Sequence, residues 1–293
     1  MDLPRHLPGA LTGIPQDINA DLHCHSRVSD GTLEPEELAR RAHDAGVQLW
    51  ALTDHDEIGG QSRARAAAEA LGMRYVTGVE ISVTWAGQTL HIVGLNVDPQ
   101  AQALVEGLES VRAGRGRRAH DMSDALAKLG IHGAYEGALK YVGNPELISR
   151  THFARYLVEI SVCSEIGEVF DKYLGEGKPA FVGHRWATLT EAVGWILAAG
   201  GVAVIAHPGR YKLTPLERHA LFEEFKQLGG LAIEVTTGSH TVAQYREYAE
   251  LAKECGFLAS RGSDFHGPEE SRVELGSLPP LPDSLQPVWS LWR

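Results

Sequence analysis

Two histidines, His23 and His25, stand one residue apart near the start of the chain, and both could bind a metal ion. Apolar and polar residues alternate over residues 18–25, which predicts a strand with both imidazoles on one face near its C-terminal end. A single His-x-His pair is weak evidence, because buried structural histidines also produce it. Its interpretation as a metal site therefore depends on the rest of the chain.

Chemically capable side chains directly follow several other predicted strands, which cover residues 47–53, 75–79, 202–206 and 257–260. These side chains are Asp54, His55, Glu80, His207, Asp264 and His266. In parallel α/β folds, active sites are built at the C-terminal ends of the strands. The repetition predicts a site that holds more than one metal ion.

Imidazole and carboxylate ligands suit Mn²⁺, Fe²⁺ or Zn²⁺, and a carboxylate such as Glu80 can bridge two ions. We expect two or three divalent ions, with Mn²⁺ as the first choice and Fe²⁺ or Zn²⁺ as alternatives. Two such ions lower the pKa of a bridging water and neutralise charge on a phosphoryl oxygen. Phosphate ester hydrolysis is among the slowest uncatalysed reactions, so it requires an electrophile of this strength.

The elements that must position these residues alternate between strands and helices. Amphipathic patterns predict helices over residues 33–45, 62–71, 188–200, 214–228 and 241–255, and capping boxes begin at Thr188 and Thr214. This rhythm predicts parallel strands covered by helices. A further strand over residues 88–95 carries His91.

Residues 101–173 show only helical patterns and hold many arginines and lysines, so we interpret this region as a helical insertion. The predicted organisation is a leader over residues 1–17, a barrel domain from 18–99 and 183–293, and a helical domain from 100–182. The proline-rich chain beyond Gly267 is expected to wrap the surface.

Composition excludes several classes of function. The net charge of −11 disfavours attraction to duplex DNA, and no run of about 18 apolar residues is present to span a membrane. The three cysteines are widely spaced and odd in number, which fits a reducing compartment and predicts a cytoplasmic protein.

The motifs resemble those of the PHP (polymerase and histidinol phosphatase) family over nearly the whole chain. The similar segments are His23-Cys24-His25 with Asp30, Thr53-Asp54-His55-Asp56, Gly78-Val79-Glu80, Ala206-His207-Pro208 and Ser263-Asp264-Phe265-His266. The resemblance implies an α/β fold, a distorted (β/α)7 TIM-like barrel with a trinuclear site. It implies that one ion is held by His23, His25, Glu80 and Asp264, a second by Glu80, His91 and His207, and a third by Asp30, His55 and His266. Three of these residues, His207, Asp264 and His266, are also expected to act in catalysis.

Within the family, the helical insertion resembles the TrpH/RNase AM-type subgroup through residues 149–155, 177–179 and 207–211. This resemblance implies removal of the 3′-phosphate from nucleoside 3′,5′-bisphosphates, or 5′→3′ trimming of short RNA oligonucleotides, by attack of a metal-bridging hydroxide. Both substrates carry a 5′-phosphate near the scissile ester. The candidates for binding it are Arg118, Arg150, His152, Lys178 and Arg210.

Two alternatives remain open from the sequence. One is a phosphatase for another phosphomonoester, such as histidinol phosphate, and the other is a non-catalytic PHP module that serves a polymerase or another protein. The presence of every expected ligand argues against the second alternative. The expected partner is therefore a small nucleotide bisphosphate or a short RNA, with no duplex DNA, no membrane and no obligate protein partner.

Overall fold

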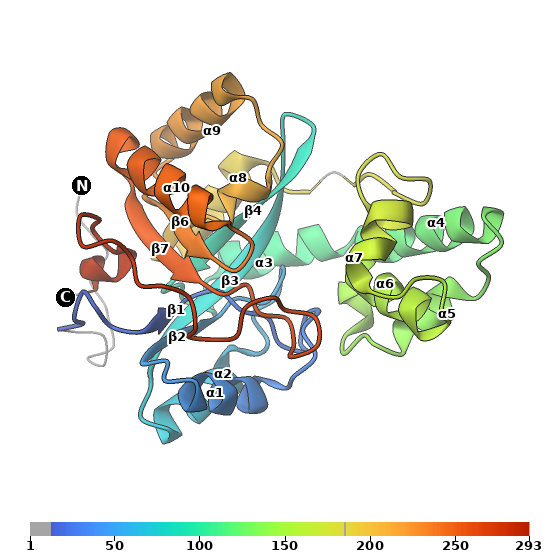
Figure 1. Ribbon diagram of the computed structural model, residues 1–293, viewed down its shortest axis with the longest axis horizontal. Helices are drawn as coiled ribbons and strands as arrows, with labels where there is room; N and C mark the ends of the chain where they lie inside the picture. The colour runs from blue at the N-terminus through green and yellow to red at the C-terminus, as the bar shows by residue number, and fades with distance from the viewer. Residues whose placement is uncertain (1–12, 185, 293) are drawn as a thin grey trace.

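The computed structural model describes residues 13–184 and 186–292, and Figure 1 shows a strand-rich body with a group of helices beside it. Most of the expected leader lies outside the described residues. The strand-rich body contains one sheet whose strands lie in chain order. The strands are β1 (Ala20–Asp21), β2 (Leu49–Leu52), β3 (Arg74–Trp85), β4 (Gln88–Leu95), β5 (Val202–Ile205), β6 (Ala232–Thr237) and β7 (Leu258–Gly262).

The first and last strands meet and nearly close the sheet into a barrel. The backbone N–H of Leu22 donates to the carbonyl of Arg261 at 3.0 Å, and Cys24 forms a parallel bridge with Phe265. The ends of β1 and β7, which are far apart in sequence, therefore lie side by side. The predicted distorted seven-stranded barrel is confirmed.

Strand direction departs from a purely parallel barrel at β4, which runs antiparallel to both β3 and β5. The cause is local, since only Ala86 and Gly87 connect β3 to β4 and a parallel crossover needs a dozen or more residues. The long hairpin also keeps β3 extended to Trp85. The prediction that Glu80 follows a strand ending at residue 79 was therefore wrong, because Glu80 lies inside β3.

The helices that pack around the barrel start where the sequence signals place them. They are α1 (Pro35–Asp44), α2 (Gln61–Ala70), α8 (Leu189–Ala198), α9 (Pro215–Gln227) and α10 (Val242–Cys255). The capping boxes that begin at Thr188 and Thr214 are confirmed, and in each of them the threonine accepts a hydrogen bond from the backbone N–H three residues later. Satisfying these free N–H groups fixes where α8 and α9 begin.

The C-terminal segment was expected to wrap the surface, but part of it is buried against the barrel. Val288, Trp289 and Trp292 are buried in a cluster with side chains of β1, β2 and β5. The indole N–H of Trp289 donates to the carbonyl of Pro15 at 3.1 Å. Burial of these large apolar side chains outweighs the tendency of a proline-rich segment to stay outside.

Between β4 and α8 the chain forms α3 (Gln102–Arg112), α4 (Arg115–Lys128), α5 (Ala134–Leu139), α6 (Arg150–Glu159) and α7 (Ile166–Val169). Leu104, Leu108 and Val111 of α3 are buried in the barrel's own core. A separate core links α4 to α7 and includes Met122 and Phe153. The predicted domain boundaries stay predictions, and the packing of α3 favours a helical unit that starts after this helix.

In residues 13–184 and 186–292, no helix combines the length and apolar character needed to cross a bilayer. The cysteines Cys24, Cys163 and Cys255 are free thiols.

Candidate metal centre

Every side chain predicted as a metal ligand lies in one connected cluster at one end of the barrel. The cluster consists of His23, His25, Asp30, His55, Glu80, His91, His207, Asp264 and His266. Its members come from the segments after β1, β2, β5 and β7 and from the interior of β3 and β4. The neighbouring rings are closely packed, with centroids 4.2 Å apart for His25 and His266 and 4.9 Å apart for His55 and His91.

The backbone turns sharply where two of these side chains leave their strands. His207 and Asp264 have φ angles of 29° and 57°, a region that non-glycine residues seldom adopt. Hydrogen bonds hold both turns, because the N–H of His207 donates to Glu234 at 2.7 Å and the N–H of Asp264 donates to the carbonyl of His23 at 2.8 Å. Such strain persists only where the surroundings fix it, and it is typical of functional sites.

Glu80 is the centre of the cluster. Its carboxylate is fully buried, and imidazole nitrogens approach both of its oxygens. The nitrogens within 3.4 Å belong to His23, His91 and His207 around Oε1 and to His25 and His55 around Oε2. A carboxylate with ligand-type nitrogens around both oxygens has the arrangement that bridging two cations requires.

Several buried polar atoms of the cluster lack a hydrogen bond among the described residues, including Asp30 Oδ1, Glu80 Oε2 and His91 Nδ1. Some approach each other closely without hydrogen-bond geometry, such as His55 Nδ1 and Glu80 Oε2 at 2.9 Å. Leaving a buried polar atom unpaired costs about 1–3 kcal/mol. These atoms could all be satisfied by divalent cations, so the residues present fit a metal centre.

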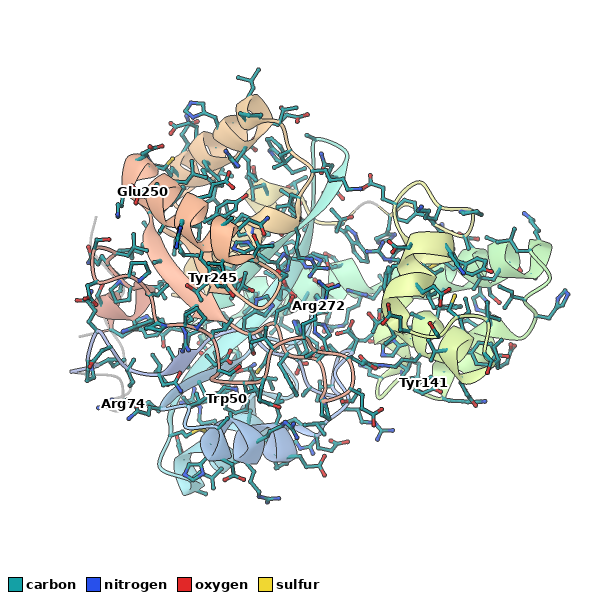
Figure 2. All side chains as sticks on the ribbon, in the orientation of Figure 1. Trp50, Arg74, Tyr141, Tyr245, Glu250 and Arg272 are labelled. Atoms are coloured by element: carbon teal, nitrogen blue, oxygen red, sulfur yellow. The ribbon has the colours of Figure 1, made fainter. Side chains whose placement is uncertain are left out.

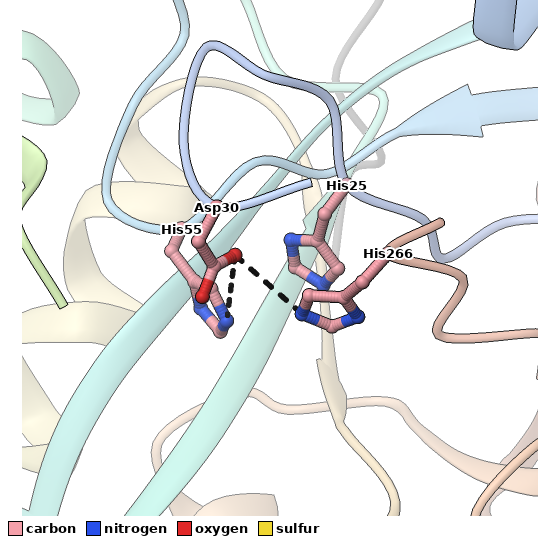
Figure 3. Close-up of side chains that lie close together, drawn as sticks. All are labelled: His25, Asp30, His55 and His266. Atoms are coloured by element: carbon pink, nitrogen blue, oxygen red, sulfur yellow. Dashed lines mark ion pairs between the residues drawn. The ribbon is translucent and has the colours of Figure 1, made fainter. Parts of the chain in front are cut away.

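One candidate ion site is made by four side chains whose ligand atoms lie within 4.8 Å of one another, namely His25, Asp30, His55 and His266. Figure 3 shows the Asp30 carboxylate facing the rings of His55 and His266. Other groups combine Glu80 with His23 and His207, His23 and His25 with Asp264, and Glu80 with His55 and His91. These groups overlap the predicted ligand sets without matching them, so the assignment of ligands to individual ions stays a prediction.

The charges of the cluster suit a cation. Burial raises the pKa values of Asp30, Glu80 and Asp264, but the surrounding imidazoles outweigh this effect and hold all three pKa values well below their usual range. Burial lowers the pKa values of His25 and His207 to about 3. Burial also acts to lower the pKa values of His23 and His55, but the neighbouring carboxylates outweigh it, so that the pKa of His55 is raised to about 9 and that of His23 lies well above its usual range. A bound cation would have to displace the protons of these two rings. Ionised carboxylates and neutral imidazoles are the forms that coordinate divalent metals.

Glu234, which was not among the predicted site residues, lies inside β6 and holds two of the candidate ligands. Its Oε1 lies 2.8 Å from Nδ1 of His23, and its Oε2 accepts the N–H of His207. A hydrogen bond at one ring nitrogen fixes the proton there and turns the other nitrogen to the ion. The available signal was a single carboxylate within the otherwise apolar run of residues 231–235.

The predicted substrate-binding residues have different surroundings. Arg210 is half-exposed and donates to Asp264 Oδ2 at 3.1 Å, so it reaches the metal cluster. Arg150 lies over the rings of Phe170 and Phe181, and Arg118 is buried over Trp186. Burial and the positive charge of Arg150 lower the pKa of Arg118 to about 9.

The two remaining candidates lie elsewhere. His152 is fully buried and accepts the N–H of Ser149, which caps α6, whereas Lys178 is exposed. Their roles toward a substrate stay predictions.

Arg115 was not among the predicted residues. It pairs with the buried Asp56 and lies over the ring of Trp186, which Arg118 also contacts. Side chains fill the region where the helical group meets the barrel, as Figure 2 shows.

A family model described as the PHP domain matches residues 21–255. The chain belongs to the PHP domain family. This family assignment agrees with the barrel and with the clustered histidines and carboxylates, and it confirms the resemblance recognised in the sequence.

Two named relatives resemble the PHP chain over almost its whole length. The 3′,5′-nucleoside bisphosphate phosphatase of Chromobacterium violaceum is 49% identical and covers 92% of this chain and 95% of its own. The 5′-3′ exoribonuclease of Haemophilus influenzae is 46% identical and covers 92% of this chain and 97% of its own.

Solved structures show the same fold. The structure of an amidohydrolase from Chromobacterium violaceum, with bound sulfate and no metal, has a TM-score of 0.90 and 47% identity and covers 94% of this chain and 95% of its own. A proposed metal-dependent phosphoesterase from Bifidobacterium adolescentis has a TM-score of 0.78 and 25% identity over 93% of each chain.

Proposed function

We propose that this PHP chain is a metal-dependent phosphohydrolase that removes the 3′-phosphate from nucleoside 3′,5′-bisphosphates, with 5′→3′ trimming of short RNA as a related activity. The observation that carries the proposal is the cluster of buried, unpaired carboxylate and imidazole atoms around Glu80, next to the cation of Arg210. The substrate class is supported by the relatives from Chromobacterium violaceum and Haemophilus influenzae, which are named a 3′,5′-nucleoside bisphosphate phosphatase and a 5′-3′ exoribonuclease.

In this proposal the clustered histidines and carboxylates hold two or three divalent ions, with Mn²⁺ as the first choice and Fe²⁺ or Zn²⁺ as alternatives. The proposed ligands are those brought together around Glu80. When bound, the ions would supply an activated water and would neutralise negative charge on the phosphoryl group. Glu80 would bridge two of them, and His207, Asp264 and His266 would line the site where the ester is cleaved.

The arginines would orient the substrate. Arg210, which contacts Asp264 at the edge of the metal cluster, is placed to approach the 5′-phosphate of a substrate whose 3′-ester lies in the metal centre. Arg150 and Arg118 belong to the helical part of the chain, and the positive charge of Arg210 adds to burial in lowering the pKa of Arg150. A second phosphate held there would fix the scissile ester in place, and such positioning can account for a large part of a rate enhancement.

The test is phosphate release by the purified chain with Mn²⁺ on three substrates, namely adenosine 3′,5′-bisphosphate, adenosine 3′-monophosphate and histidinol phosphate. We expect the bisphosphate to have the highest kcat/KM, with Glu80→Gln as the inactive control. Preference for histidinol phosphate would favour the alternative phosphatase. Absence of turnover on all three and on 5′-phosphorylated short RNA would favour the non-catalytic module.

A further inference from the structure

The two oxygens of Asp30 have different surroundings. Oδ2 lies next to α6, where it accepts the hydroxyl of Thr151 at 3.1 Å and, more weakly, that of Ser149 at 3.4 Å. Oδ1 faces the rings of His55 and His266, at 3.8 Å and 3.5 Å from their Nε2 atoms, and has no hydrogen bond among the described residues. One oxygen is thus held by the helical insertion, and the other remains available to an ion.

A buried arginine of α6 strengthens this connection. Arg155 donates through Nη2 to the backbone carbonyl of Asp30 at 2.5 Å and forms a two-point ion pair with Glu270 at 2.6 and 2.7 Å. Glu270 lies four residues after His266, in the segment that follows β7. One guanidinium therefore joins the loop that carries Asp30 to the loop that carries His266.

The loop over residues 26–31 is fixed from the barrel side as well. Asp54 accepts the hydroxyls of Ser26 and Ser29 at 2.7 and 2.6 Å. On the helical side, the backbone of Gly143 comes so close that a Cβ there would lie 2.4 Å from the carbonyl of Arg27. The loop over residues 26–31 therefore packs between the barrel and the helical insertion and contacts both.

We propose that the first turn of α6 positions Asp30 as a metal ligand, so that the helical insertion sets the affinity of the ion site formed by His25, Asp30, His55 and His266. This inference rests on the proposed metal centre. Thr151 and Arg155 act as positioning residues, because they fix the carboxylate and the backbone of Asp30 without facing the ion. Removing hydrogen-bond partners of metal ligands typically costs about 10- to 100-fold in metal affinity.

The cleanest variant is Thr151→Val, which removes the hydroxyl and preserves the shape of the side chain. Ser149 is less suitable, because its side chain also caps α6. Thr151→Ser keeps a hydroxyl and should rescue binding. Thr190→Val is the matched control, because Thr190 occupies the same second position of a helix, in α8, and is exposed.

The readout is the number of Mn²⁺ ions bound per chain across a range of free Mn²⁺, measured by equilibrium dialysis and electron paramagnetic resonance on the full chain. We expect Thr151→Val to weaken one site by about 10- to 100-fold and to leave the others unchanged. The melting temperature of each metal-free variant shows whether folding is affected.

The outcomes separate this inference from the proposed function. If the wild type binds several Mn²⁺ ions and Thr151→Val binds them all equally well, the positioning role is refuted while the metal centre stands. Equal weakening of every site, with a lower melting temperature, would also refute it, because the hydroxyl would then act on the fold. A wild type that binds none of Mn²⁺, Fe²⁺ and Zn²⁺ would overturn both proposals.

Discussion

Replacing Glu234 by Gln tests whether this carboxylate sets the proton position of a metal-ligand histidine. Glu234 contacts Nδ1 of His23 at 2.8 Å and the N–H of His207 at 2.7 Å. With an ion bound at Nε2, the proton of His23 would lie on Nδ1 and point to Glu234; Nε2 faces the cluster, 3.1 Å from Nε2 of His25. Glutamine has the same shape but only one side-chain oxygen. Its NH2 group must therefore face either Nδ1 of His23 or the backbone N–H of His207.

The expected loss follows from this mismatch. A hydrogen bond to a charged acceptor contributes about 1.5–3 kcal/mol, which corresponds to about 10- to 150-fold in an equilibrium constant. If the amide N–H faces His23, the ring proton moves to Nε2, and a protonated nitrogen cannot bind an ion. We therefore expect Glu234→Gln to bind Mn²⁺ about 10- to 100-fold more weakly.

Isothermal titration of the metal-free protein with Mn²⁺ measures this effect directly. Glu224→Gln is the matched control, because Glu224 is an exposed glutamate in α9 that accepts the indole N–H of Trp85. Unchanged Mn²⁺ affinity in Glu234→Gln, or an equal loss in both variants, would refute the reasoning.

Three further predictions concern the ions and the arginines. Chelation should abolish phosphate release and Mn²⁺ should restore it, whereas undiminished turnover of metal-stripped protein would exclude the mechanism. Glu80→Gln should lose most bound metal and most activity, because the bridging charge is removed; elemental analysis and a rate assay check this, and normal occupancy would contradict the bridge. Arg150→Ala or Arg210→Ala should lower kcat/KM for a 3′,5′-bisphosphate by about 10- to 150-fold and affect the 3′-monophosphate far less. Arg117→Ala, on the exposed face of α4, is the control. Equal losses of kcat/KM on both substrates would assign Arg150 and Arg210 to the scissile phosphate or to folding.

Features that depend on neighbouring residues could be predicted from the sequence. The capping boxes fix the starts of α8 and α9, and a short run of apolar residues before each ligand motif indicates a strand. Parallel strands with their C-terminal ends at one edge then bring His25, His55 and His266 together. The clustering of the predicted ligands follows from these local rules.

Features that depend on distant contacts could not be predicted. The pairing of β3 with β4 carries the strand through Glu80, and Val288 and Trp289 are buried only because the barrel offers them a cluster to join. The sequence likewise does not show that Arg155 reaches Glu270, 115 positions away. Such contacts arise from packing between elements, which periodicity within a single element does not reveal.

In the proposed function, the arginine group would let an acidic chain select a small polyanion. Arg118 lies over Trp186 and Arg150 lies over Phe170, and the charge of Arg150 together with burial lowers the pKa of Arg118, since like charges in a buried setting repel each other. A phosphate group that enters would neutralise this repulsion, so the local site favours an anion although the chain carries a net charge of −11. Duplex nucleic acid would instead meet the negative charge of the whole surface. A substrate with two phosphates could therefore bind both parts of the chain, with one phosphate at the metal cluster of the barrel and the other at the arginines of the helical insertion.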